Sequence, residues 1–323
     1  MTLVWTEDIT LQFPRNLTNG HNIEHLALSH DARYIAIGYD KGVDVWDTRS
    51  TLNVREPAYH FRGSTRIHSV KWLPDRSTLI HTHAGARVYI ATISAAGFAT
   101  SGFRKSGAQD AAVMAAVIAE GLIAIAYSHT IEIRRHFPSA LEPLKWHALG
   151  ELPSPPALNG QIQGPVLVKS VHSLRSNRLI VSYTGPGIRN TLVVCWRINT
   201  KQPSLSEIEA VNDLAGIVAD VSDASNSVLM VDATFGAYRL YNVGSATSRK
   251  NFVPRAPGFG SVSVAQPVSD AHFLGVDTIV GTGLGQILLW KEDTTVLQGL
   301  SFRNYSDHRI RSISVSLVNS IDL

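Results

Sequence analysis

The chain has 323 residues, of which 44% are hydrophobic and 17% charged, and its net charge at pH 7 is +3. This length is sufficient for a large core, and repeated all-β folds often use it as one domain. The Lys and Arg residues are scattered without long runs, so the composition does not indicate the concentrated basic patch of a nucleic-acid-binding protein. The single cysteine, Cys195, excludes an internal disulfide and lies in an apolar run that predicts a buried side chain.

The sequence shows neither the pattern of a secretory signal nor that of a membrane-spanning helix. Residues 1–8 include acidic residues and lack the apolar segment of a secretory signal. No apolar run approaches the roughly 20 residues of a membrane-spanning helix. The sequence therefore predicts a soluble protein of the cytoplasm or nucleus, without a membrane partner.

A unit of two apolar strands followed by an alternating strand recurs along the chain. The third strands of successive units end at residues 46, 91, 134, 196, 241 and 290. All intervals but one resemble the about 40–45 residues of a four-stranded propeller blade. The long interval contains Pro153-Ser154-Pro155-Pro156, which indicates an inserted loop.

The second strand of each unit is almost continuously apolar, as at 35–37 and 122–126. A strand covered on both faces has this pattern, so we expect neighbouring sheets to cover it. Segment 111–121 has high helix propensity, but the register of the repeat predicts a first strand there. Weaker fourth strands are predicted at 58–61, 99–104, 146–151, 205–210, 248–253 and 296–302.

These units resemble the WD40 repeat family. Gly20-His21 resembles the glycine–histidine dipeptide of that family, and Trp46-Asp47 resembles its closing dipeptide. The turns at 28–33 and 40–42 resemble its turns. The resemblance implies an all-β fold: a single β-propeller of four-stranded antiparallel blades that spans residues 1–323.

In that family a His, a hydroxyl residue, an Asp and a Trp form a buried hydrogen-bonded set within a blade. The resemblance implies this structural role for His21, Asp40 and Trp46, although Ile37 occupies the position of the hydroxyl residue. Later units lack the closing Asp, so we expect their blades to depend on apolar packing. The other residues with an implied structural role are Asp47, Trp196, Tyr241 and Trp290.

The two ends of the chain bear on the number of blades. Residues 308–314 resemble residues 65–71, which begin the second unit, and so predict the first strand of a seventh blade. Within the N-terminal segment 1–19, residues 9–13 are candidates for the outer strand that closes the ring. We expect a seven-bladed design whose closing blade is incomplete at 308–323; a six-bladed ring with a tail is the alternative.

No catalytic or metal-binding pattern rises above background. His81-Thr82-His83 places two imidazoles on one face of a strand, but no nearby cysteine or acid completes a zinc site. The glycine-rich segment 281–285 lacks the ending of a phosphate-binding loop and predicts a tight turn. We therefore expect no enzymatic activity, cofactor, metal or small-molecule substrate.

Basic residues are expected in turns at one rim of the ring. They are Lys41, Arg66, Arg104, Lys105, Arg189 and Arg255. Loops on a rigid scaffold often carry binding sites, and basic ones suit an acidic or phosphorylated peptide. The WD40 resemblance implies a non-enzymatic scaffold that binds partner proteins through rim loops and the mouth of the central channel. The alternatives are a propeller hydrolase or lyase with a channel-mouth site, and nucleic-acid binding through the basic rim.

Overall fold

The structure is a computed structural model whose described residues are almost entirely β-strand, with one short 3-10 helix at Pro203–Leu205. The described residues are 23–29, 31, 33–48, 57–73, 77–94, 97–106, 113–119, 121–136, 145–155, 165–186, 188, 190–232, 237–252, 270–274, 277–281, 286–290 and 297–301. Within these ranges no helix has the length and apolar character needed to cross a membrane.

The described strands form six antiparallel sheets of four strands each, and we call these sheets blades. The first blade contains β1 (Ile23–Leu28), β2 (Tyr34–Tyr39), β3 (Gly42–Asp47) and β4 (Tyr59–Arg62). The second contains β5 (Ile67–Trp72), β6 (Thr78–His83), β7 (Arg87–Ser94) and β8 (Gly97–Arg104). The third contains β9 (Val113–Ala119), β10 (Leu122–Tyr127), β11 (Thr130–His136) and β12 (Trp146–Glu151).

The remaining blades repeat this order. The fourth blade contains β13 (Leu167–Leu174), β14 (Arg178–Thr184), β15 (Thr191–Arg197) and β16 (Glu207–Leu214). The fifth contains β17 (Ile217–Ser222), β18 (Ser227–Asp232), β19 (Ala237–Asn242) and β20 (Ser248–Phe252). The sixth contains β21 (Asp270–Leu274), β22 (Asp277–Gly281), β23 (Gln286–Trp290) and β24 (Leu297–Ser301).

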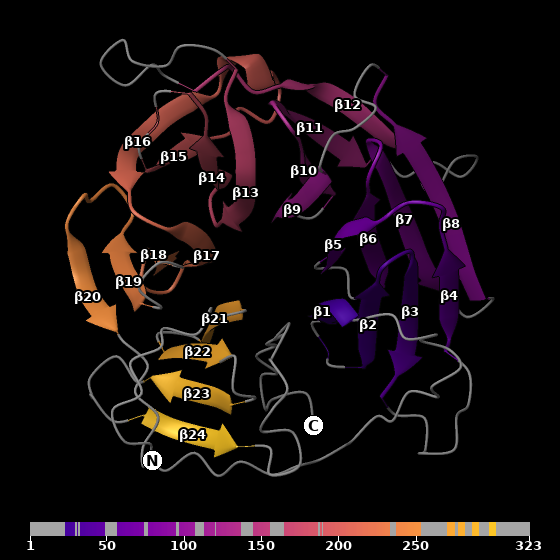
Figure 1. Cartoon of the computed structure of the whole chain (residues 1–323). Helices are drawn as coiled ribbons and strands as arrows, with labels where there is room; N and C mark the ends of the chain where they lie inside the picture. Colours follow the sequence, from indigo (N-terminus) through magenta and orange to yellow (C-terminus); the bar gives the residue numbers. More distant parts are fainter. Residues whose placement is uncertain are drawn as a thin grey trace.

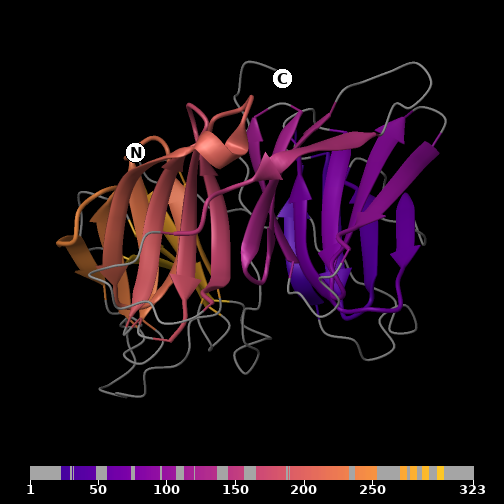
Figure 2. The ribbon, with the colours of Figure 1, turned by 90° about the horizontal axis from the view of Figure 1, so that it is seen from above.

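The blades are arranged around a central axis, with the first strand of each blade nearest the centre and the fourth at the periphery (Figure 1). Consecutive first strands contact one another from β1 through β5, β9, β13 and β17 to β21. Seen from the side, the strands run between two rims, where the connections lie (Figure 2). This is the β-propeller that the sequence predicted, and segment 113–119 is a strand, as the register of the repeat required.

A β-bulge recurs at the same place in the first strand of several blades. In four blades the first strand has a β-bulge at the same place relative to its partner: between Ile23 and His25, Ile67 and Ser69, Val168 and Ser170, and Val218 and Asp220. A bulge adds one residue to a strand and increases its twist. The shared position shows that these blades are equivalent units.

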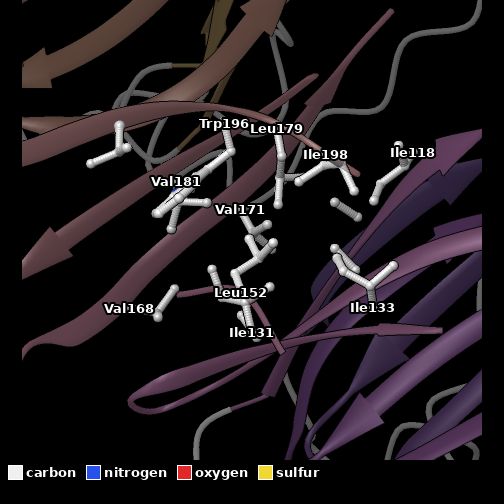
Figure 3. Packing of buried hydrophobic residues seen from close by; sticks show 14 of the residues in the cluster. Ile118, Ile131, Ile133, Leu152, Val168, Val171, Leu179, Val181, Trp196 and Ile198 are labelled. Carbon is white, nitrogen blue, oxygen red and sulfur yellow. The ribbon is translucent and has the colours of Figure 1, made fainter. Parts of the chain in front are cut away.

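Apolar side chains fill the spaces between adjacent blades. The cluster between the third and fourth blades includes Ile133, Leu152, Val171, Leu179 and Trp196, which point toward one another (Figure 3). Similar clusters join the first blade to the second, the second to the third, and the fourth to the fifth. All residues of β6 and β10 are buried. For β10, the continuous apolar run at 122–126 predicted this burial.

The number of blades in the complete ring stays a prediction. Residues 9–13 and 308–323, on which the seventh blade depends, lie outside the described residues. The single-domain assignment to residues 1–323 stays a prediction for the same reason.

Substitution of Leu179 by Ala tests the packing between blades. Because Leu179 is 0% exposed and lies between two blades, we expect the free energy of unfolding to fall by about 2–5 kcal/mol. Urea denaturation followed by tryptophan fluorescence measures the change. Leu205→Ala, at a side chain that is 59% exposed, is the matched control and should change stability by less than about 0.5 kcal/mol.

Candidate functional site

The four predicted basic residues that the structure describes lie at one end of the blades. Because strands within a blade alternate in direction, the turns between second and third strands share a rim with the connections between blades. We call this the Lys41 rim and define it by residues 40–41, 63–66, 84–86, 105–106 and 128–129. Lys41, Arg66 and Lys105 lie in these connections, and Arg104 ends the adjoining strand β8.

Backbone hydrogen bonds fix the connections of the Lys41 rim to one another. The Gly63 N–H donates to the Lys41 carbonyl oxygen (2.7 Å), and the Ile67 N–H donates to that of Asp40 (3.0 Å). The Ala84 N–H donates to the Arg66 carbonyl oxygen (2.8 Å). The turns of the first two blades therefore form one connected backbone, from which the exposed Lys41 side chain projects.

Arg66 forms a two-pronged ion pair with Glu24 across the junction of the first two blades. Its Nε and Nη2 atoms lie 3.1 Å from the two Glu24 carboxylate oxygens. This hydrogen bonding raises the pKa of Arg66. The Arg66 side chain is 63% exposed, so the pair orients the guanidinium group but contributes little stability.

Arg104 and Lys105 differ in their surroundings. Arg104 is exposed, and its Nε donates to the Gly85 carbonyl oxygen (3.1 Å). The Lys105 ammonium group donates to the Thr130 hydroxyl (2.6 Å), contacts the Glu151 carboxylate and lies 4.7 Å from the centre of the Tyr127 ring. Lys105 thus connects the second and third blades, whereas the Arg104 side chain is exposed.

Ser64 of the Lys41 rim and Arg87, which directly follows the 84–86 turn, were not predicted from the sequence. Arg87 begins β7, and its Nη1 donates to the hydroxyl of the exposed Ser64 (3.2 Å). Arg87 is the direct cross-strand neighbour of Arg104. The sequence did not indicate a role for Arg87, because its pairing with Arg104 depends on the register of β7 and β8.

Arg189, Arg255 and His21 lie outside the described residues, and the side chain of Trp290 is likewise not described, although Trp290 ends β23. Their proposed roles therefore stay predictions.

The predicted blade residues that are described lie in or beside the core. Trp46, Trp196 and Tyr241 are buried, and Asp40 lies in the turn before β3. Asp47 accepts a hydrogen bond from Arg33 Nε (3.2 Å).

The fourth blade differs from the expectation that apolar packing alone supports its tryptophan. The Trp196 indole N–H donates to the Tyr183 hydroxyl (3.3 Å), so a phenol satisfies it.

His81 and His83 form a buried pair at the end of β6. Their rings share a hydrogen bond of 2.8 Å between His81 Nδ1 and His83 Nε2, among the aromatic rings of Phe61 and Tyr89. Burial lowers the pKa of His81 to about 3 and that of His83 to about 4, so both imidazoles are neutral at pH 7. His83 Nδ1 also contacts the Thr65 carbonyl oxygen (3.2 Å), which couples the pair to the Lys41 rim.

A second polar cluster joins three first strands near the axis. The Asp220 carboxylate in β17 accepts a hydrogen bond from the Phe273 N–H (2.9 Å) and lies 3.3 Å from His272 Nδ1, both in β21. His172 in β13 lies 4.0 Å from the same carboxylate. Burial is the largest single influence on Asp220 and opposes its charge, but the hydrogen bonds from His272 and Phe273 and the nearby His272 and His172 together outweigh burial and lower the pKa of Asp220.

No set of three or more His, Cys, Asp or Glu residues suited to a metal ion occurs among the described residues. Cys195 is 2% exposed, and burial raises the pKa of its thiol to about 12, so the thiol is neutral, as a buried cysteine was predicted to be.

The fold defines the class of protein: the chain has the β-propeller fold of WD40-repeat proteins. Solved structures similar to it include Cps50 (Swd1) from Myceliophthora thermophila, at 15% identity and a TM-score of 0.59 over 87% of this chain and 86% of that one. The RRP9 WD40 repeats align with 92% of this chain and 84% of theirs, at 14% identity and a TM-score of 0.61. Raptor from Chaetomium thermophilum matches 92% of this chain but 26% of its own, at 15% identity and a TM-score of 0.63.

Sequence similarity to known proteins is limited. No protein-family model matches the chain. A segment of 83 residues is 29% identical to LLGL scribble cell polarity complex component 2 of Danio rerio. That segment is 24% of this chain and 8% of the relative, so the chain spans a small part of that protein's length.

The stability of the protein should fall in acid because of the His81–His83 pair. Unfolded imidazoles take up protons below about pH 6.5, whereas the folded pair resists protonation until about pH 4. The unfolded state therefore binds more protons in this window, and each histidine removes up to about 1.4 kcal/mol of stability per pH unit. Above pH 6.5 the contribution of the pair is constant.

Urea denaturation at a series of pH values from 7 to 4 measures this dependence. The double variant His81→Phe/His83→Phe keeps an aromatic pair that cannot titrate, and its stability should decline less steeply. His147, an exposed histidine on β12, supplies the control variant His147→Phe, which should follow the wild type. Parallel curves for the wild type and the double variant would contradict the assignment.

Proposed function

We propose that this protein is a non-enzymatic interaction scaffold that binds a partner protein or peptide at the Lys41 rim. The observation that carries the proposal is the connected backbone of this rim, which holds Lys41, Arg66 and Arg104 at fixed positions on exposed turns and strand ends. Fixed loops reduce the conformational entropy lost on binding. Loops on a rigid scaffold are also where binding sites concentrate.

The charge of the rim favours an acidic partner. Arg66 is ion-paired with Glu24, and Lys105 is ion-paired with Glu151. Lys41 and Arg104 are exposed. Exposed guanidinium groups recognise carboxylate and phosphate through paired hydrogen bonds. Arg66 directly precedes β5, the innermost strand of the second blade, whereas Arg104 ends β8, the outermost strand, so these basic residues extend from the inner to the outer part of the Lys41 rim.

Affinity capture from a native lysate tests this function. The bait is the full chain, compared with the triple variant Lys41→Ser/Arg66→Ser/Arg104→Ser, which leaves the bridging Lys105 intact. We expect the wild type to retain specific proteins that the triple variant loses, while the melting temperatures of the two baits agree. The matched control is Lys145→Ser/Arg175→Ser/Lys201→Ser, three exposed basic residues at the opposite rim.

Two outcomes would contradict the proposal. The two triple variants would retain the same proteins if the Lys41 rim were not the binding surface. Capture of RNA or DNA that falls steeply as salt concentration rises would instead favour binding to the phosphate backbone of nucleic acid.

A further inference from the structure

Like charges face each other across neighbouring strands at three places in the described sheets. The pairs are Arg87 with Arg104, Arg178 with Arg197, and Glu132 with Glu151. Side chains directly opposite on adjacent strands lie within about 5.5 Å at their Cβ atoms, and like charges in this arrangement are destabilising. Each pair therefore needs a counter-charge, and the three sites differ in where it comes from.

The arginine pair of the fourth blade has its counter-charge within the chain. The Glu209 carboxylate of β16 contacts the Arg197 guanidinium group and lies 4.0 Å from Arg178 Nη1. These three residues and Ser176 line an open cavity of about 780 Å³ at the rim opposite Lys41. One carboxylate thus bridges two guanidinium groups on adjacent strands.

The glutamate pair of the third blade is also compensated. Arg134 lies 3.1 Å from the Glu132 carboxylate, and Lys105 contacts Glu151. Each acid therefore has a cation of its own. Both examples show that this fold surrounds a like-charge pair with groups of opposite sign.

The pair Arg87–Arg104 has neutral partners instead. Arg87 donates to the Ser64 hydroxyl, and Arg104 donates to the Gly85 carbonyl oxygen. Among the described residues, neither guanidinium group has a carboxylate partner. Arg104 and Ser64 are exposed, so an anion from outside the chain can reach the pair.

The surroundings hold the two arginines on one face. Tyr89, two residues along β7 from Arg87, packs against Phe61 of the first blade with 4.6 Å between ring centres. Alternate residues of a strand share a face, so Arg87 and its cross-strand neighbour Arg104 face the first blade. Ser64 lies in the connection between these two blades and contacts Arg87 from that side.

We infer that Arg87, Arg104 and Ser64 form an anion-binding site for a phosphorylated side chain of the partner peptide. This inference rests on the proposed function and specifies its ligand. A phosphate carries about two negative charges and three acceptor oxygens, which match two guanidinium groups and a hydroxyl. A carboxylate carries one charge and would neutralise half of the pair.

Fluorescence anisotropy with two pools of short degenerate peptides tests the site, one pool with a central phosphoserine and the other with serine. The wild type should bind the phosphorylated pool about tenfold more tightly, because hydrogen bonds between charged groups are the strong ones. The double variant Arg87→Gln/Arg104→Gln should lose this preference. Its melting temperature should equal or exceed that of the wild type, because a repulsive pair is removed.

The control variant Arg175→Gln/Lys201→Gln removes the same charge from the opposite rim and should keep the preference. If the double glutamine variant does not fold, Arg104→Gln alone, at an exposed strand end, carries the same expectation. Equal affinity for the two peptide pools, or a preference that survives in the glutamine variants, overturns the inference. The inference is also overturned if the wild type binds an RNA oligonucleotide instead of the phosphorylated pool and the double glutamine variant loses that RNA binding.

The two proposals fail separately. If the Lys41 rim variant loses its captured proteins while the wild type shows no preference for phosphoserine, the anion site is wrong and the interaction function stands. If the captured proteins are also unaffected by the rim variant, both are wrong.

Discussion

The fold depends on apolar burial between sheets that cannot be stable alone. The second strands β6 and β10 are buried along their whole length, so each requires a neighbouring sheet on both of its faces. The clusters that supply this cover draw residues from two blades at a time, as Leu179 and Ile133 do. A blade is therefore stable as part of an array, and stability is shared between neighbours.

Polar contacts between neighbouring blades fix how one blade is aligned against the next. The Arg66–Glu24 pair, the Lys105–Glu151 contact and the Asp220–Phe273 hydrogen bond each join two different blades. Apolar contacts allow one sheet to slide over another, whereas a hydrogen bond requires a particular alignment. These contacts fix the relative positions of the turns and hence the shape of the rim.

The architecture could be predicted from the sequence because it depends on a periodic pattern. The continuous apolar run 122–126 predicted a strand covered on both faces, and register placed a strand at 113–119 against its helix propensity. The alternation of strand direction also placed Lys41, Arg66 and Arg104 on one rim.

Individual side-chain partners could not be predicted in this way. The pairing of Arg87 with Arg104 depends on the cross-strand register of β7 and β8, and the contact of Trp196 with Tyr183 depends on the directions of two long side chains on adjacent strands. The spacing of residues in the sequence gives neither the register nor the side-chain direction. The sequence therefore predicted a rim of basic residues, but it did not predict which side chains contact one another there.

The bulge between Val218 and Asp220 has a consequence for how this chain can change over generations. The extra residue, Ala219, brings Asp220 to the position from which it accepts the Phe273 amide of the next blade. Deleting one residue here would turn the carboxylate to the other face of β17 and leave that amide without its acceptor. Insertions and deletions should therefore accumulate in the rim loops and be rare within this inner strand. Variation in loop length would then change the shape of the rims while the spacing of the inner strands stays constant.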